Sequence, residues 1–299
     1  MHRILWGDYL KFKKNDYVTR KSYNHDIVFK VVNIENNIVY LKGVDFRLYA
    51  DALIDDLVIC ERNDSNDKEI IENNLRELCL DRDNYFYIPG KILHIDGDKD
   101  YLDRCMYFYD SLGIMANGIS LSENSIHKKI VELVNEYRPD IVVITGHDAL
   151  IRKGDMSQYE NSDNFALAIK EVRKYEKSQD KLIVIAGACQ SNYELLIKSG
   201  ANFASSPKKI NIHALDPAII ASSLAMSDKN KSIDLIKIIE KTKYGSDGIG
   251  GIITNGTMYV GYPRWILIIL KIKYYLWLIL VIGLYIKEIE IRLKSFMDL

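Results

Sequence analysis

Two short apolar runs, each followed directly by a side chain capable of catalysis, constrain the fold of this chain most strongly. The run 141–146 leads into His147, and the run 182–188 leads into Cys189. Runs of about 4–8 β-branched and apolar residues bounded by glycine are typical of strands buried on both faces, as in a parallel sheet. Catalytic groups in such sheets gather at the carboxyl ends of the strands. If these two strands are neighbours, an imidazole and a thiol meet at one edge, as a cysteine nucleophile requires.

From about residue 90 the chain alternates between strand patterns and amphipathic helix patterns. Further strands are expected at 92–95, 118–121 and 201–206, with helices between them. This alternation predicts a parallel sheet covered by helices on both faces. We therefore expect an α/β catalytic domain over residues 90–263.

The N-terminal part of the chain has a different character. Residues 1–60 contain several short β-rich stretches separated by turn-like residues, which predicts a small SH3-like β-barrel. Such a barrel binds peptide or nucleic acid in some proteins and only braces a neighbouring domain in others, and bracing is the interpretation favoured here. A polar linker and one helix are expected over 61–89.

Composition and charge exclude some classes of function. Among 299 residues, 40 Lys and Arg balance 41 Asp and Glu, so bulk charge gives no reason to expect nucleic acid or an anionic membrane as partner. The four cysteines form no CxxC pair, which favours a reducing compartment. The first residues lack the apolar core of a secretory signal, so we expect cytoplasmic synthesis. Nothing in the sequence calls for a metal or another cofactor.

The order and spacing of the two reactive residues agree with one strand–helix–strand crossover. The histidine comes first and the cysteine follows 189 − 147 = 42 residues later, within the sequence Gly-Ala-Cys-Gln. This arrangement resembles the caspase-like cysteine peptidases, in which the histidine lies about 50 residues upstream of the cysteine. We expect Cys189 to be the nucleophile and His147 the general acid and base. The dipole of a helix at 191–198 is expected to favour the thiolate.

The backbone N–H groups of Asp148 and Cys189 are the candidates for binding the oxyanion. The caspase-like peptidases usually have glycine after the histidine, where this chain has Asp148. A carboxylate beside a developing negative charge is unfavourable, so we expect the Asp148 side chain to point away.

Asp96 and Asp98 follow the first strand of the predicted α/β domain and leave several alternatives open. The segment fails as an EF-hand loop because Tyr101 occupies the glycine position. The Asp-x-Asp pattern resembles the magnesium-dependent haloacid-dehalogenase phosphatases, although the further acidic ligands of that family are missing after the later strand. In a caspase-like peptidase, both carboxylates would line a pocket for a substrate Arg or Lys. The remaining alternative is a helix cap formed by Asp98 or Asp100.

Several longer motifs resemble the YabG family of sporulation-specific peptidases. They are Tyr101–Cys105, Ile144–Asp148, Gly187–Tyr193, Gly200–Pro207 and Ile212–Pro217. The resemblance covers roughly residues 3–262. It implies a protease of spore formation that trims precursors of the spore coat and cortex near basic residues, in association with the forming coat, with His147 and Cys189 as catalytic pair.

The last part of the chain, residues 264–299, is an apolar and amphipathic tail. Within 265–286, the lysines Lys271 and Lys273 leave an uninterrupted apolar run of 13 residues, Tyr274–Ile286. A membrane span needs about 20 residues, so a packed or interfacial helix is favoured over a membrane anchor, and an altered reading frame is a further alternative. For the whole chain, a magnesium-dependent phosphatase and a non-enzymatic coat or scaffold protein remain the alternatives to a cysteine protease.

Overall fold

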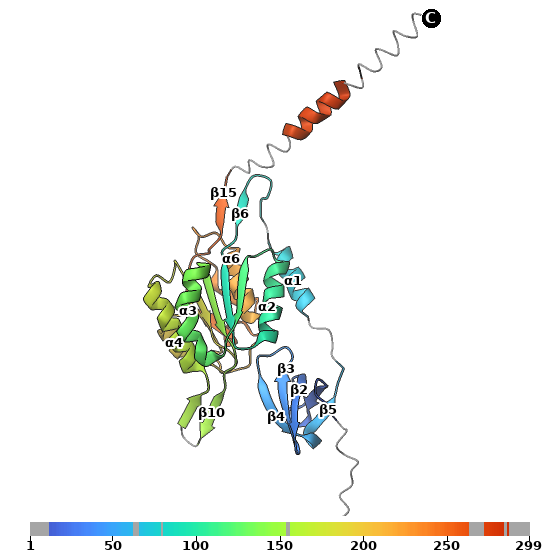
Figure 1. Ribbon diagram of the computed structural model, residues 1–299, viewed down its shortest axis with the longest axis vertical. Coiled ribbons are helices and arrows are strands. Elements are labelled where there is room, and N and C mark those ends of the chain that lie inside the picture. The colour runs from blue at the N-terminus through green and yellow to red at the C-terminus, as the bar shows by residue number, and fades with distance from the viewer. Residues whose placement is uncertain are drawn as a thin grey trace, which may run out of the picture. The chain divides into compact units, whose positions relative to one another are not determined.

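The computed structural model describes residues 12–61, 66–78, 80–153, 156–262, 272–283 and 286, without the side chains of 152–157. The chain divides into two compact units, which are described separately. The first consists of Met1–Leu78 and Pro89–Tyr259, and the second of Cys79–Ile88 and Val260–Leu299. Both β-sheets that matter for the site belong to the first unit (Figure 1).

The N-terminal strands form one antiparallel sheet of five strands in the order β4-β3-β2-β1-β5. Their bounds are β1 Tyr17–Arg20, β2 Phe29–Glu35, β3 Ile38–Gly43, β4 Tyr49–Leu53 and β5 Leu57–Ile59. Alternate side chains on these strands point into a small apolar core, as a period of two dictates; it includes Val18, Phe29, Val31 and Leu41. The predicted antiparallel β-structure is confirmed, while closure into an SH3-like barrel stays a prediction.

The central sheet has six strands in the order β14-β13-β12-β9-β7-β8. All neighbours are parallel except β13 and β14, which are antiparallel. The strands are β7 Ile92–Asp96, β8 Ala116–Ser120, β9 Ile141–Thr145, β12 Ile183–Ala186, β13 Phe203–Ser205 and β14 Ile249–Gly251. The expected α/β sheet is therefore present, including the strands predicted at 118–121 and 201–206.

Helices cover both faces of this sheet, which explains why its central strands are apolar on both sides. The helices are α1 Asp67–Arg76, α2 Lys99–Ser111, α3 Glu123–Tyr137, α4 Ser162–Tyr175, α5 Tyr193–Lys198, α6 Asp216–Ala225 and α7 Leu235–Ile239. One face packs against α1, α2, α6 and α7, and the other packs against α3, α4 and α5.

The order of the strands determines where a site can form. The chain crosses from β7 to β8 on one side and then returns to β9 on the other side of β7. At such a switch point the connections leave the two strands in opposite directions, which opens a crevice at their carboxyl ends. The switch point lies between β7 and β9, and β12 is the next strand.

Some features of the fold differ from the expectations. The segment after His147, for which the sequence pattern indicated no strand, contains a hairpin formed by β10 Leu150–Lys153 and β11 Met156–Tyr159. In the tail, residues 272–283 are helical, and Trp277 and Leu280 are 61% and 64% exposed in this helix. The packed or interfacial helix expected for the tail stays a prediction. The rest of 264–299, apart from residue 286, lies outside the described residues. The short strands β6 Phe86–Ile88 and β15 Tyr259–Gly261 pair with each other.

Candidate active site

The strands that precede His147 and Cys189 are direct neighbours in the central sheet. Strands β9 and β12 pair in parallel, with Ile141 opposite Ile183 and Ile144 opposite Ala186. Both reactive residues therefore follow the carboxyl ends of adjacent strands, at the same edge. Within the part of the chain that the structure describes, no hydrogen bond joins the two side chains directly.

The imidazole of His147 is held by three side chains, two from the start of α2 and one from the N-terminal sheet. Its Nε2 atom lies 2.9 Å from Oδ2 of Asp98, at the start of α2. Its ring packs against Tyr49 of the N-terminal sheet and Tyr101 of α2, with centroids 4.2 and 5.7 Å away. Among the described residues, its Nδ1 atom has no hydrogen-bond partner although it is buried. The ring is therefore oriented through one nitrogen, while the other is available.

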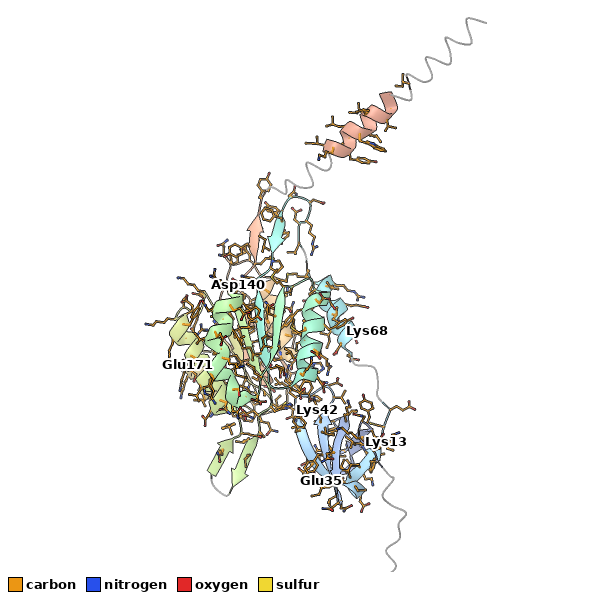
Figure 2. The ribbon with its side chains drawn as sticks, in the orientation of Figure 1. Lys13, Glu35, Lys42, Lys68, Asp140 and Glu171 are labelled. Atoms are coloured by element: carbon orange, nitrogen blue, oxygen red, sulfur yellow. The ribbon has the colours of Figure 1, made fainter. Side chains whose placement is uncertain are left out.

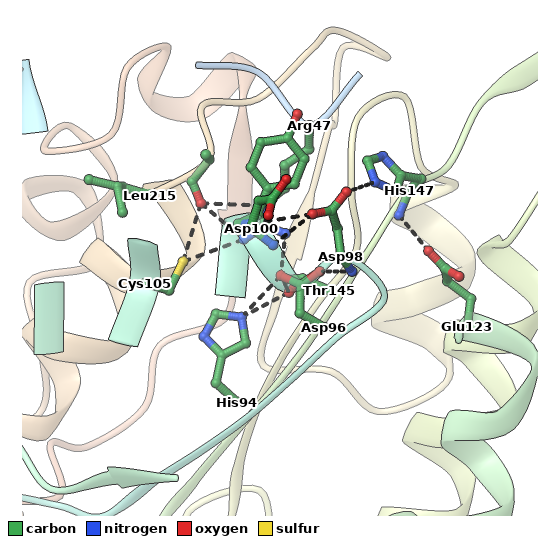
Figure 3. Close-up of polar contacts among 12 residues, drawn as sticks. Arg47, His94, Asp96, Asp98, Asp100, Cys105, Glu123, Thr145, His147 and Leu215 are labelled. Atoms are coloured by element: carbon green, nitrogen blue, oxygen red, sulfur yellow. Dashed lines mark hydrogen bonds and ion pairs between the residues drawn. The ribbon is translucent and has the colours of Figure 1, made fainter. Parts of the chain in front are cut away.

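The backbone at His147 is fixed by Glu123, in the first turn of α3. The N–H of His147 donates to Oε1 of Glu123 over 2.9 Å (Figure 3). Two glycines at the ends of neighbouring strands leave room for this carboxylate. A Cβ at Gly97 would lie 2.1 Å from Oε1 of Glu123, and a Cβ at Gly146 would lie 2.5 Å from the same atom. A side chain at either position would therefore have to displace the carboxylate of Glu123 from the backbone of His147.

Asp98 connects the histidine with the N-terminal sheet. Its carboxylate accepts hydrogen bonds from Lys42 Nζ at 2.7 Å and from the Tyr49 hydroxyl at 3.1 Å. It also caps α2 by accepting from the N–H groups of Asp100 and Tyr101, as one alternative had anticipated. Burial would raise the pKa of Asp98, but its hydrogen bonds from His147 and Lys42 outweigh burial and hold the pKa well below its usual range. Figure 2 shows Lys42 where the N-terminal sheet meets the central sheet.

Asp96 is fully buried and is paired with a cation from the N-terminal sheet. Its carboxylate forms an ion pair with Arg47 and accepts from the Thr145 hydroxyl over 2.8 Å. Burial acts to raise the pKa of Asp96, but the charge of Arg47 and a hydrogen bond from His94 bring it far below normal. His94 itself lies fully buried in the core. The role of Asp96 and Asp98 in a pocket for basic substrate residues stays a prediction, since each carboxylate here holds a cation of its own chain.

Cys189 is more deeply buried than its place at the end of a strand suggested. Its thiol is fully covered and accepts a hydrogen bond from the N–H of Ile212 over 3.3 Å. Burial is the main cause that raises the pKa of this thiol to about 12. The helix expected at 191–198 begins only at Tyr193 and is capped by Asn192. A lowered pKa from its dipole is therefore not seen in this arrangement.

The backbone groups proposed to bind the oxyanion lie at the carboxyl ends of β9 and β12. The carboxylate of Asp148 accepts from the Asn161 N–H over 2.8 Å and from the Ser162 hydroxyl, at the start of α4. It is thus engaged with α4. Among the described residues, neither the N–H of Asp148 nor that of Cys189 has a hydrogen-bond acceptor. Two backbone donors are therefore available at the ends of β9 and β12.

Sequence reasoning missed the contributions of the N-terminal sheet to this site. Lys42, Arg47 and Tyr49 all contact residues at the ends of β7 or β9. The only local signal was the position of Arg47 between the apolar residues Phe46 and Leu48, where a buried charge needs a partner. In the described part of the chain, no cluster of three or more His, Cys, Asp or Glu could hold a metal ion. Within the same residues, no helix is long and apolar enough to span a membrane.

Comparisons with known proteins give a consistent result. The model of the YabG peptidase U57 family matches residues 13–263. The sporulation-specific protease YabG of Bacillus subtilis (strain 168) is 36% identical over 286 residues, which cover 85% of this chain and 99% of that protein. Among solved structures, a cobalamin-binding protein from Desulfitobacterium hafniense DCB-2 matches 45% of this chain and 58% of its own, with 21% identity and a TM-score of 0.31. A TM-score of 0.31 is too low to indicate a shared fold or function.

Proposed function

Because this chain belongs to the YabG peptidase U57 family, we propose that it is a sporulation-specific protease with a cysteine mechanism, in which Cys189 attacks and His147 transfers protons. Membership of this family supports the protease activity and does not favour a phosphatase or a scaffold protein. The cysteine mechanism is supported chiefly by the parallel pairing of β9 and β12, which brings both residues to one edge of the sheet.

The contacts of His147 suggest a division of labour between its two nitrogens. Asp98 binds Nε2, so Nδ1 is the atom that can take the proton of the Cys189 thiol. The resulting thiolate attacks the substrate carbonyl carbon, and the N–H groups of Asp148 and Cys189 stabilise the oxyanion. The imidazolium then protonates the leaving amine, and a water molecule activated by the same imidazole hydrolyses the thioester.

The burial of the Cys189 thiol limits how its thiolate can form. A thiol with a pKa of about 12 is almost entirely protonated at neutral pH. The thiolate therefore forms only as its proton moves to His147 or when the cover over the thiol is removed. The carboxylate of Asp98 favours the first route, because it stabilises the imidazolium that results.

The substrates and the place of action are inferred from the family. The proposed substrates are precursors of the spore coat and cortex, cleaved near Arg or Lys. The protein would be made in the cytoplasm of the sporulating cell and then associate with the forming coat. Asp96 and Asp98 are the proposed acidic groups near the basic residue of the substrate.

The mechanism is tested by removing each reactive group in turn. We expect Cys189→Ala and His147→Ala to abolish cleavage of an arginine-containing peptide, because these two side chains supply the nucleophilic thiol and the proton carrier of the proposed mechanism. Cys60→Ala, which removes a half-buried thiol of the N-terminal sheet, serves as the control and should keep full activity. Activity is measured with an internally quenched peptide, and folding is checked by circular dichroism.

Mapping the alkylated thiol adds an independent measurement. Iodoacetamide should inactivate the protease in proportion to the modification of Cys189, as determined by mass spectrometry. A well-folded Cys189→Ala protein with undiminished activity would refute the cysteine mechanism.

A further inference from the structure

The loop between β3 and β4, residues 44–48, reaches from the N-terminal sheet to the proposed catalytic residues. We propose that this loop occupies the substrate groove of the protease as an internal ligand, with Arg47 in the pocket that takes the basic residue of a substrate. The inference deepens the proposed function and rests on it, since it defines which groups bind an arginine side chain and which bind the main chain beside it.

The side chain of Arg47 fills a pocket built for a guanidinium group. It is fully buried, and its Nη1 atom pairs with the carboxylate of Asp96. Its Nε and Nη2 atoms donate to the carbonyl oxygen of Ala214 over 3.3 and 3.1 Å, and Nη2 also lies 3.4 Å from the Cys105 sulfur (Figure 3). A planar group with several donors suits this set of acceptors better than the point charge of lysine.

The main chain of the loop pairs with residues 213 and 214 and then turns at Arg47, where the N–H of Leu48 donates to the carbonyl oxygen of Phe46 over 2.8 Å. The N–H of Ala214 donates to the carbonyl oxygen of Asp45 over 2.8 Å, and Phe46 forms an antiparallel bridge with His213. The hydroxyl of Tyr101 donates to the Phe46 carbonyl oxygen over 2.7 Å. Backbone pairing of this kind, here limited to residues 45 and 46, is a common way for proteins to bind peptides independently of most side chains.

The pocket and the backbone edge lie directly beside the proposed nucleophile. The edge continues into Ile212, whose N–H donates to the Cys189 sulfur over 3.3 Å. The backbone N–H of Arg47 also interacts with this thiol, which burial keeps protonated. An arginine with its side chain opposite Asp96 and its backbone beside Cys189 has the placement of the residue preceding a scissile bond. While the loop remains there, a substrate cannot reach the thiol.

The same contacts would be present if Arg47 were only a fixed part of the interface between the two sheets. The two possibilities differ in whether the pocket accepts an arginine from another peptide once Arg47 is removed. Arg47→Gln empties the pocket of its cation, and Arg47→Lys keeps a cation there with fewer donors. Arg173→Gln is the matched control, because Arg173 also bonds to backbone carbonyls but lies between α4 and β12, on the other face of the sheet.

The experiment measures the rate at which iodoacetamide alkylates Cys189 in the full-length protein, with and without a peptide that contains one arginine. We expect Arg47→Gln to raise the rate about tenfold or more, because an occluded site is available only in the fraction of molecules in which the loop has left. Arg47→Lys should give an intermediate rate, and Arg173→Gln the rate of the wild type. The arginine peptide should slow alkylation of Arg47→Gln, whereas a peptide with glutamate in place of arginine should not.

This selective protection separates the inference from a loss of structure, since an unfolded chain would not distinguish the two peptides. Should Arg47→Gln fail to fold, Arg47→Lys provides the same comparison. Equal alkylation rates in the wild type and in the folded Arg47 variants would overturn the inference, and so would equal protection by both peptides. If the alkylation results contradict the inference but the wild type cleaves arginine peptides, the proposed cysteine protease stands. Only the proposal that the loop occupies the substrate groove is then refuted. If alkylation behaves as expected but no peptide is cut by any variant, the proposed function fails instead.

Discussion

At the scale of single residues, Asp98 has the largest number of distinct roles in the site. Its carboxylate contacts Nε2 of His147, the ammonium group of Lys42 and the N-terminus of α2. In the proposed proton transfer it is a positioning residue, because it acts there through the imidazole; its proposed place near the basic residue of the substrate is a separate role. A carboxylate in this place fixes the ring orientation and stabilises the imidazolium, as in other histidine-dependent hydrolases.

We expect Asp98→Asn to lower kcat by up to about 100-fold with little change in KM, a loss at the lower end of what general acid–base catalysis contributes. An amide still fills the space but cannot stabilise the charged ring, so the pH dependence of kcat should shift as well. Asp100→Asn is the control, since Asp100 contacts the same lysine but is 73% exposed. A change in KM alone, with the pH profile of the wild type, would show that Asp98 serves substrate binding and not the histidine.

At the scale of elements, the beginning of α6 determines the backbone edge that binds the loop. Asp216 accepts hydrogen bonds from the N–H groups of His213 and Lys243 over 2.9 and 3.0 Å. Burial is the main cause that raises the pKa of this carboxyl group to about 6, above the value of about 3.9 in an unfolded chain. The folded state therefore binds the proton more tightly than the unfolded state does.

The sign of the pH effect follows from this difference. The stabilisation by protonated Asp216 is complete below about pH 4 and is lost as the pH rises through about 6. As the pH rises across this range, the free energy of unfolding of the wild type should fall by on the order of 2 kcal/mol. Asp216→Asn should abolish this fall. Urea denaturation at several pH values measures the effect, with Asp163→Asn at the exposed first turn of α4 as control. Parallel curves for the wild type and Asp216→Asn would contradict the assignment.

The elements themselves could be predicted where the pattern is local. The strands ending before His147 and Cys189 were recognised because continuous β-branched runs have few other uses, and their adjacency followed from the crossover between them. The hairpin of β10 and β11 was missed because its polar residues resemble those of a loop. The role of Arg47 could not be predicted, because Asp96, its partner, is 49 residues away and only the tertiary fold brings them together.

At the scale of the whole molecule, the N-terminal sheet and the central sheet belong to one compact unit and are joined by a buried ion pair. The Arg47–Asp96 pair is fully buried at this contact. Removing one member of a buried ion pair leaves the other without compensation, which costs about 3–5 kcal/mol in typical cases. We infer that the two sheets do not behave as independent domains.

We expect Arg47→Met to lower the free energy of unfolding by about 3–5 kcal/mol, and Arg47→Met combined with Asp96→Asn to recover most of that loss. Urea denaturation of the two variants, the Asp96→Asn single variant and the wild type completes a double-mutant cycle. Hydrogen exchange of the strands in both sheets should show loss of protection at the same denaturant concentration. Losses that simply add in the double variant would mean that the two charges do not interact.

The carboxylate of Glu123 has a consequence for how sequences of this kind can vary. It occupies the space above Gly97 and Gly146 and supports the backbone of His147 from a helix that forms no part of the proposed groove. A methyl group at either glycine would force this carboxylate away from the N–H of His147, although every reactive atom would still be present. Related chains that lack one of the two glycines should therefore carry a shorter residue at position 123, so that the three positions covary.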